Sequence, residues 1–252
     1  MQQPLTAIPI NIPGLAIYEC NGGDPAHRKT LLEMYAQWFP QYAYYLPYME
    51  YRTSQPVDFD PRFIERWWYV ERDGKPAGFR FSKYLKARNI SVGMGSAIVK
   101  EYREFEFGPY HRLSDLLFHL TNDQLCADAT ASGRPTPDGF VVEIESPQLV
   151  NGYKRYGYTI LELPVDYVEP PFIYEFTRYI EPDVLAKLQF EPMHLVIFPV
   201  GGKHLDPNDT ALLTNITLGL LIDHYGLSED HWAVQRALAS INQVGTRPKS
   251  LK

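Results

Sequence analysis

The sequence of 252 residues is poor in cysteine and has no excess of basic charge. Its two cysteines, Cys20 and Cys126, argue against a disulfide framework and against a zinc site built from cysteines. The net charge of −6 excludes a broad nucleic-acid footprint, which needs a basic excess. The fullest apolar stretch, Leu218 to Ile222, is far shorter than the roughly 18 residues of a membrane-spanning helix. These absences predict a globular protein that binds neither nucleic acid nor a membrane.

The first eleven residues also lack the basic flank and the long apolar stretch of a secretory signal. Together with the scarcity of cysteine, this predicts a protein of a reducing compartment, and we expect a cytoplasmic location. Apolar residues make up 45% of the chain and charged residues 21%, which predicts a packed core and excludes global disorder.

Hydrophobic periodicity and turn signals predict strands and helices that alternate along the chain. The expected strands span residues 15–18, 67–71, 77–84, 90–102, 140–145, 158–167 and 194–200. Helices are expected to start at Asp24-Pro25, Gly108-Pro109, Ser146-Pro147, Asp206-Pro207 and Ser228. Hairpins and crossover helices together predict an α/β fold with a mixed, mainly antiparallel sheet flanked by helices. We expect one domain over residues 1–200, with a C-terminal two-helix extension over 201–252 packed on it.

Two local patterns sharpen this expectation. Asp73-Gly74 predicts a tight turn between two strands. The spacing of Leu113, Leu116, Leu117 and Leu120 predicts the buried face of a helix. The C-terminal helices also carry apolar stripes, which are typical of core packing; a homodimer contact is the alternative.

The segment that follows the 140–145 strand carries the most specific motif. It places Asn151, Tyr153, Gly157 and Tyr158 in a helix that ends before the next strand. This pattern resembles the GNAT (Gcn5-related N-acetyltransferase) superfamily, which shows an Asn, then Tyr, three residues, Gly and an aromatic at this place. The hairpin with Gly78 and the element order over residues 15–200 are also similar. The resemblance implies an atypical GNAT acyltransferase that transfers an acyl group from acetyl-CoA or another acyl-CoA directly to a small amine, without a metal.

Such a transfer needs a base for the amine and an acid for the departing thiolate. The resemblance implies that Tyr153 is the acid; the alternative is a tyrosine packed on the sheet. Glu143 and Glu145 lie two apart on one predicted strand, so they share a face, roughly 6.6 Å apart. A carboxylate there is a candidate base, and two like charges raise one of the pKa values. The alternative is a solvated or arginine-paired face.

The resemblance also implies where the acyl-CoA binds. Backbone groups of Ile98, Val99 and Lys100 would pair with the pantetheine arm, and Asn151 is a further candidate. The phosphates would face the helix start after Gly108. The family's glycine-rich loop is reduced here to one glycine, and His111 and Arg112 take its place. They would neutralise phosphate by charge, or form an ordinary polar helix start.

Many of the 18 tyrosines gather between Met34 and Tyr51. In the resembling family this region bends over the acceptor, so Tyr42, Tyr45 and Tyr48 are candidates for an amphipathic wall that binds an amine. The alternative is that they cover the edge of the core. The seven histidines are scattered and form no HExxH motif, so no metal site is expected. Two other functions stay open: a non-catalytic binding module that uses the aromatic pocket, and a structural or assembly subunit.

Overall fold

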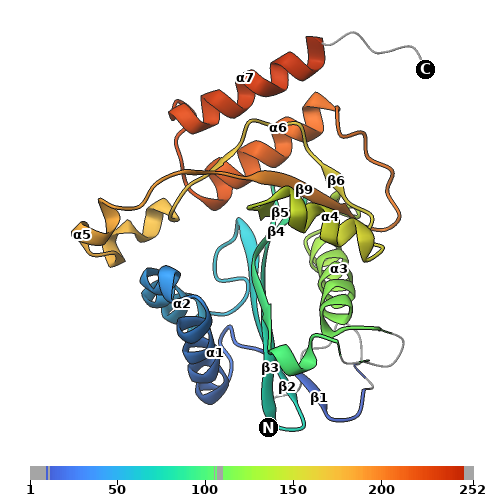
Figure 1. Ribbon diagram of the computed structural model, residues 1–252. Coiled ribbons are helices and arrows are strands. Elements are labelled where there is room, and N and C mark those ends of the chain that lie inside the picture. The colour runs from blue at the N-terminus through green and yellow to red at the C-terminus, as the bar shows by residue number, and fades with distance from the viewer. Residues whose placement is uncertain (1–9, 11, 105, 107–109, 247–252) are drawn as a thin grey trace. The chain divides into compact units, whose positions relative to one another are not determined.

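The computed structural model describes residues 10, 12–104, 106 and 110–246, with side chains up to Val244 (Figure 1). Its strands are β1 (Leu15–Glu19), β2 (Phe63–Arg72), β3 (Lys75–Leu85), β4 (Ile90–Ile98), β5 (Gly139–Ile144), β6 (Leu161–Glu162), β7 (Val168–Glu169), β8 (Glu191–Pro192) and β9 (His194–Pro199). Its α-helices are α1 (Pro25–Trp38), α2 (Leu46–Thr53), α3 (Leu113–Ala131), α4 (Pro147–Arg155), α5 (Pro182–Leu185), α6 (Thr210–Leu218) and α7 (Trp232–Thr246).

Seven strands form one sheet in the order β1-β2-β3-β4-β5-β9-β6, and β7 pairs with β8 apart from it. The pair β4–β5 is parallel, whereas β1–β2, β2–β3, β5–β9 and β6–β9 are antiparallel. The predicted mixed, mainly antiparallel sheet flanked by helices is therefore confirmed. In the described part of the chain, no helix combines the length and the apolarity that a membrane crossing requires.

The chain forms two compact units. The first comprises residues 1–87 and 93–135, and the second comprises 88–92 and 136–252. The division falls inside β4, after Val92. The predicted C-terminal helices belong to the same unit as β5 and β9.

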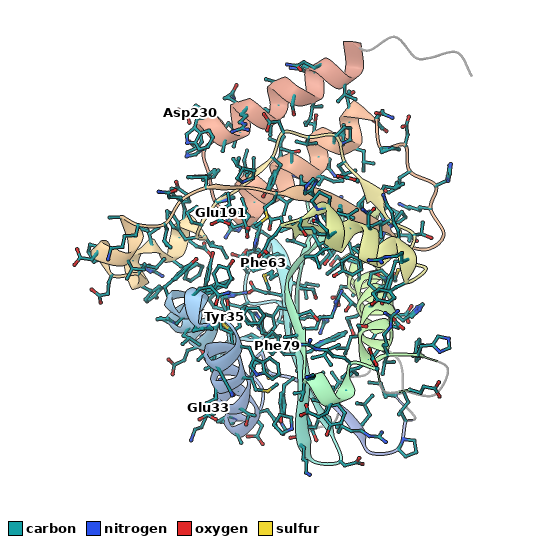
Figure 2. The ribbon with its side chains drawn as sticks, in the orientation of Figure 1. Glu33, Tyr35, Phe63, Phe79, Glu191 and Asp230 are labelled. Carbon is teal, nitrogen blue, oxygen red and sulfur yellow. The ribbon has the colours of Figure 1, made fainter. Side chains whose placement is uncertain are left out.

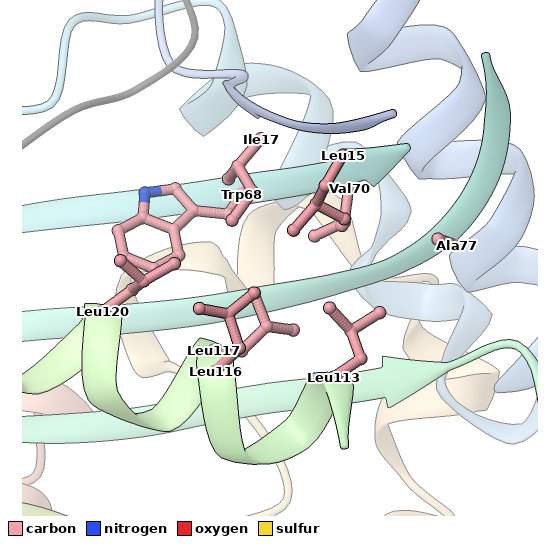
Figure 3. Packing of buried hydrophobic residues seen from close by; sticks show 9 residues of the cluster. All are labelled: Leu15, Ile17, Trp68, Val70, Ala77, Leu113, Leu116, Leu117 and Leu120. Atoms are coloured by element: carbon pink, nitrogen blue, oxygen red, sulfur yellow. The ribbon is translucent and has the colours of Figure 1, made fainter. Parts of the chain in front are cut away.

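The first unit is a sheet covered on both faces. Helices α1 and α2 lie on one face of β2 and β3, and α3 lies on the other (Figure 1). Successive strand residues point to opposite faces, so each strand supplies side chains to both layers. The predicted leucine face of α3 is confirmed, because Leu113, Leu116, Leu117 and Leu120 pack on β1, β2 and β3 (Figure 3). Their partners on the strands are Leu15, Ile17, Trp68, Val70 and Ala77.

The opposite face of this sheet is aromatic. Phe79 and Phe81 of β3 stack with ring centroids 4.6 Å apart. The ring centroid of Tyr35 on α1 lies 6.1 Å from that of Phe79, and the Trp38 ring lies 5.7 Å from Phe79. Figure 2 labels Tyr35 and Phe79. These large rings bury much apolar area, so they hold α1 on the sheet.

Glycine is required at two places in this unit. The predicted turn between β2 and β3 is confirmed: Asp73 and Gly74 both have positive φ, 50° and 71°, as a two-residue hairpin turn demands. A Cβ on Gly78 would lie 2.6 Å from the Ala97 carbonyl oxygen, so β3 approaches β4 too closely for a side chain.

The second unit contains β5, β9 and β6 with α4, α6 and α7. In Figure 1, α6 and α7 lie along each other. Asp209 caps α6 by accepting from the amides of Ala211 and Leu212. A π-helical segment, Gly219–His224, continues α6. Gly157 and Gly226 follow their helices with φ of 82° and 81°, a conformation that favours glycine.

Several predicted boundaries differ from the structure. The strand expected at 158–167 is reduced to Leu161–Glu162: the Leu163 amide still donates to the Leu195 carbonyl, but the Val165 amide turns back to the Leu163 carbonyl. The strand expected at 90–102 ends at Ile98 and continues as a 3₁₀ turn at Lys100–Tyr102. The last two helices begin at Thr210 and Trp232, later than expected. Helix α2 was not expected, and the start expected at Gly108-Pro109 lies outside the described residues.

A candidate proton-transfer site around Glu143

Glu143 lies on β5 and binds two tyrosine hydroxyls. The Tyr167 hydroxyl donates to Oε1 of Glu143, and the Tyr225 hydroxyl donates to Oε2 at 2.8 Å. Both tyrosines are buried, with 2% and 4% of their surface exposed. Burial raises the pKa of the Glu143 carboxyl to about 7, while the two donated hydrogen bonds oppose this shift. A carboxylate with this pKa is suited to accept a proton near neutral pH.

A second carboxylate reaches the same tyrosine. The Tyr225 oxygen also lies 3.0 Å from Oε1 of Glu169 on β7. Tyr225 has a single hydroxyl hydrogen, so it can donate to only one of the two carboxylates. Both contacts are hydrogen bonds only when one carboxyl carries a proton and donates it to the Tyr225 oxygen. The cluster of Glu143, Tyr167, Tyr225 and Glu169 is therefore built to hold one extra proton.

The electrostatics assign this proton to Glu169. Burial and the charge of Glu143 raise its pKa to about 9, with smaller contributions from Glu191 and Glu145, while the hydrogen bond with Tyr225 opposes this shift. The pKa of Tyr167 is raised well above its usual value by burial and by the two carboxylates. Between these two pKa values, near pH 8, Glu169 is then protonated and Glu143 carries the negative charge that the two tyrosines stabilise.

The backbone holds both tyrosines in place. The amide of Tyr225 donates to the Leu220 carbonyl at 2.9 Å, and its carbonyl accepts from the Tyr174 amide at 2.8 Å. The carbonyl of Tyr167 accepts from the amide of Met193 at 3.3 Å. Segments far apart in the sequence thus fix the two phenols against β5.

Tyr153 and Glu143 lie on opposite faces of β5 and β9. Phe140 pairs directly with Phe198, so these two share one face, and Glu143, three residues after Phe140, lies on the other. The ring of Tyr153 on α4 packs edge-to-face on Phe198 with a centroid distance of 5.3 Å. The predicted acid and base are therefore separated by the sheet, and Asn151 lies exposed on the same helix as Tyr153.

The backbone pairing of β5 changes along the strand. β4 pairs with β5 at Ser91–Phe140 and Val92–Val141. Glu143, two residues after Val141, is paired with Leu195 of β9. Glu143 is therefore placed in the second unit by β9.

Glu145 does not share the strand position of Glu143. Strand β5 ends at Ile144, and Glu145 follows it as an exposed residue. The sequence pattern missed the second carboxylate of the cluster, which is Glu169, and it missed Tyr167 and Tyr225. Tyr167 and Glu169 stand two residues apart, so a period-two pattern was the available signal for that pair. No local pattern points to Tyr225, which is 82 residues from Glu143.

The other residues expected to bind the acyl-CoA belong to the first unit. The Val99 amide donates to the Ala77 carbonyl at 2.9 Å, and the Ile98 carbonyl accepts from Nε of Arg103. Lys100 opens the 3₁₀ turn. Arg112 precedes α3 and forms an ion pair with Asp115 at 3.1 Å, next to exposed His111. Gly108 lies outside the described residues, so the phosphate loop stays a prediction.

The three tyrosines expected to bind the acceptor differ in their surroundings. Tyr48 is buried, and its hydroxyl donates to Oε1 of Glu65 at 2.8 Å. Tyr42 and Tyr45 are half-buried and contact Tyr44, with centroid distances of 6.3 and 4.8 Å. Tyr48 is thus part of the core of the first unit. Among the described residues, no group of three or more His, Cys, Asp or Glu side chains is arranged to hold a metal ion.

No family model matches the sequence, and no curated protein matches it. Among solved structures, the chain is similar to a protein assigned to the GNAT acetyltransferases from Bacteroides thetaiotaomicron, with 21% identity over 84% of this chain and 99% of that one and a TM-score of 0.46. It is also similar to a Salmonella typhimurium acetyltransferase that modifies the N-terminal serine of a 50S ribosomal protein, with 11% identity, coverage of 79% and 99%, and a TM-score of 0.45.

A third similar structure is Arabidopsis thaliana NAA60 in complex with acetyl-CoA, with 13% identity, coverage of 75% and 99%, and a TM-score of 0.43. All three identities lie below 25% and all three TM-scores below 0.5.

Proposed function

We propose that this protein is an acyl-CoA-dependent N-acyltransferase that transfers the acyl group directly to a small amine. The observation that carries the proposal is the environment of Glu143 on β5: two phenols hold this carboxylate, and its pKa is raised. An amine reaches the reaction as an ammonium ion at neutral pH, so a base of this kind is required before it can attack a thioester.

The proposed roles divide between the two faces of β5. Glu143 accepts the proton of the amine on one face. Tyr153, on the other face, donates its hydroxyl proton to the departing thiolate, as the family resemblance implies. The C–N bond forms as the C–S bond breaks, and no covalent bond to the protein is made. Glu145 is a weaker candidate for the base, because it is exposed beyond the strand end.

The first test is binding of the acyl donor. A ligand at about 100 times its Kd stabilises a protein by about 2.7 kcal/mol, which gives a clear increase in Tm. We expect such an increase with acetyl-CoA and with CoA. Release of free CoA is then measured with a panel of small primary amines and with a peptide that has a free N-terminus. Absence of both the Tm increase and CoA release would contradict the proposed function.

The second test addresses the acid. Tyr153→Phe removes the hydroxyl and keeps the ring that packs on Phe198. We expect kcat to fall on the order of a hundredfold, with the Kd for acetyl-CoA unchanged. Tyr156→Phe is the matched control, since Tyr156 lies three residues further on and is 64% exposed. Equal kcat for both variants would remove Tyr153 from the mechanism.

A further inference from the structure

Two hydrogen bonds lead from Glu143 to Glu169 in the second unit. Oε2 of Glu143 lies 2.8 Å from the Tyr225 oxygen, which lies 3.0 Å from Oε1 of Glu169. Glu169 on β7 is half-buried, and its backbone is paired in register with Glu191 on β8. Glu191, which Figure 2 labels, is exposed. The hydrogen bonds therefore begin at the proposed base and end at a partly exposed carboxyl beside an exposed strand residue.

We propose that Tyr225 and Glu169 form the proton exit of Glu143, through which the proton taken from the amine leaves for solvent at the Glu191 edge. This inference rests on the proposed acyl transfer. It adds two residues to the reaction that neither the motif nor the family resemblance marks. Tyr225 acts as the relay, and Glu169 acts as the proton store between turnovers.

The protons balance along this path. An N–H bond of the ammonium breaks, and an O–H bond forms on Glu143. Glu169 loses its proton to solvent beside Glu191. Tyr225 then gives its hydroxyl proton to Glu169 and takes the proton of Glu143. The phenol ends unchanged, Glu169 is again protonated, and Glu143 regains its negative charge for the next amine.

The charged groups around the path favour outward transfer. Glu169 faces the charges of Glu143, Glu191 and Glu145. Protonation of Glu143 removes the nearest of these charges, so the proton of Glu169 is held less strongly at that moment. The Tyr167 hydroxyl offers no second exit, because in the described part of the chain it donates to Glu143 and to no other group.

The first experiment examines the protons without any substrate. Glutamate labelled with ¹³C at the side-chain carboxyl reports protonation by NMR, and Glu143→Gln and Glu169→Gln assign the two signals. We expect a protonated Glu169 and an ionised Glu143 at pH 8, between the two pKa values. In Tyr225→Phe, the titration of one carboxyl should depend less on the charge of the other than in the parent. Two ionised carboxyls at pH 8 in the parent would overturn the proton exit, whatever the activity.

The second experiment measures turnover with acetyl-CoA and the best amine of the panel. Tyr225→Phe should lower kcat on the order of tenfold, with KM for the amine unchanged, because proton removal becomes slow. Added imidazole should restore kcat in this variant by accepting the proton directly. The parent should not respond to imidazole. Glu169→Gln should behave like Tyr225→Phe, since glutamine keeps the hydrogen bond but stores no proton.

Tyr167→Phe is the matched control. It also removes one phenol from Glu143, but it leaves the path to Glu169 intact. Its turnover should fall without gaining a response to imidazole. If Tyr225→Phe and Tyr167→Phe show the same kcat and the same response to imidazole, the proton exit is wrong, whereas the proposed acyltransferase activity is unaffected. If CoA does not bind and no amine is acylated, the proposed function fails and the exit fails with it.

Discussion

The hydroxyl of Tyr48 donates to Oε1 of Glu65 across 2.8 Å, and both side chains are buried in the first unit. Glu65 also lies 3.1 Å from the guanidinium of Arg52 and 3.4 Å from Nζ of Lys83. The tyrosine that was expected to line an acceptor site instead supports a buried carboxylate between two cations. The charge of Lys83 is further stabilised by the ring of Phe63, 4.4 Å away.

Glu65→Gln should therefore destabilise the protein strongly. The substitution leaves Arg52 and Lys83 in the core without their shared anion, and such a loss costs about 3–5 kcal/mol. The free energy of unfolding is measured by urea denaturation at pH 7. Asp60→Asn is the control, because the Asp60–Arg62 pair is largely exposed on the arginine side, at 66%, and should change stability by about 1 kcal/mol or less. Similar losses in the two variants would contradict the importance of the buried cluster.

Tyr48→Phe separates a core role from an acceptor role. It removes one hydrogen bond to a charged group, so we expect a loss of about 1.5–3 kcal/mol in the free energy of unfolding. The KM for the amine should not change, because the Tyr48 hydroxyl is hydrogen-bonded to the buried Glu65. A normal stability combined with a raised KM would return Tyr48 to the acceptor site.

Local signals predicted those parts of the fold that depend on a few neighbouring residues. The Asp73-Gly74 turn and the leucine face of α3 have such signals, and both are confirmed. The short β6 and the late starts of α6 and α7 depend on tertiary contacts. Asp209, for example, caps α6 although Asp206-Pro207 offers an equally good local signal.

The candidate site was likewise predicted only where local sequence signals exist. Glu143 was predicted from its strand, but its electrostatic partner is Glu169 and not its neighbour Glu145. Period-two spacing requires a strand that continues, and β5 ends one residue before Glu145. Tyr225 reaches Glu143 only because the segment after α6 packs on β5, and the sequence near Tyr225 contains no sign of that contact.

Leu117→Ala tests the packing of α3 on the sheet. Leu117 is fully buried against the strands, so the cavity left by alanine should cost about 2–5 kcal/mol of stability. Leu149→Ala is the control on another helix, since Leu149 is 53% exposed and should stay within about 0.5 kcal/mol of the parent. Equal urea midpoints would show that α3 does not pack as in Figure 3.

The raised pKa values of Glu143 and Glu169 make stability depend on pH. Both rise from the ordinary 4.5, to about 7 and about 9, so between these limits the folded protein binds more protons than the unfolded chain. The free energy of unfolding then falls as pH rises through this window, because the folded state loses protons that the unfolded chain has already released. We expect a lower Tm at pH 9 than at pH 6.

Glu169→Gln should flatten this dependence, since glutamine cannot ionise and still bonds to Tyr225. Glu65 makes stability depend on pH in the opposite direction, because Lys83 and Arg52 lower the pKa of its carboxyl. Its contribution to the free energy of unfolding is therefore lost only as pH falls below 4.5. Measuring Tm from pH 6 to pH 9 therefore isolates the Glu143–Glu169 pair from the Glu65 cluster. An equal slope in the parent and in Glu169→Gln would mean that Glu169 releases no proton between pH 6 and pH 9, which would contradict its raised pKa.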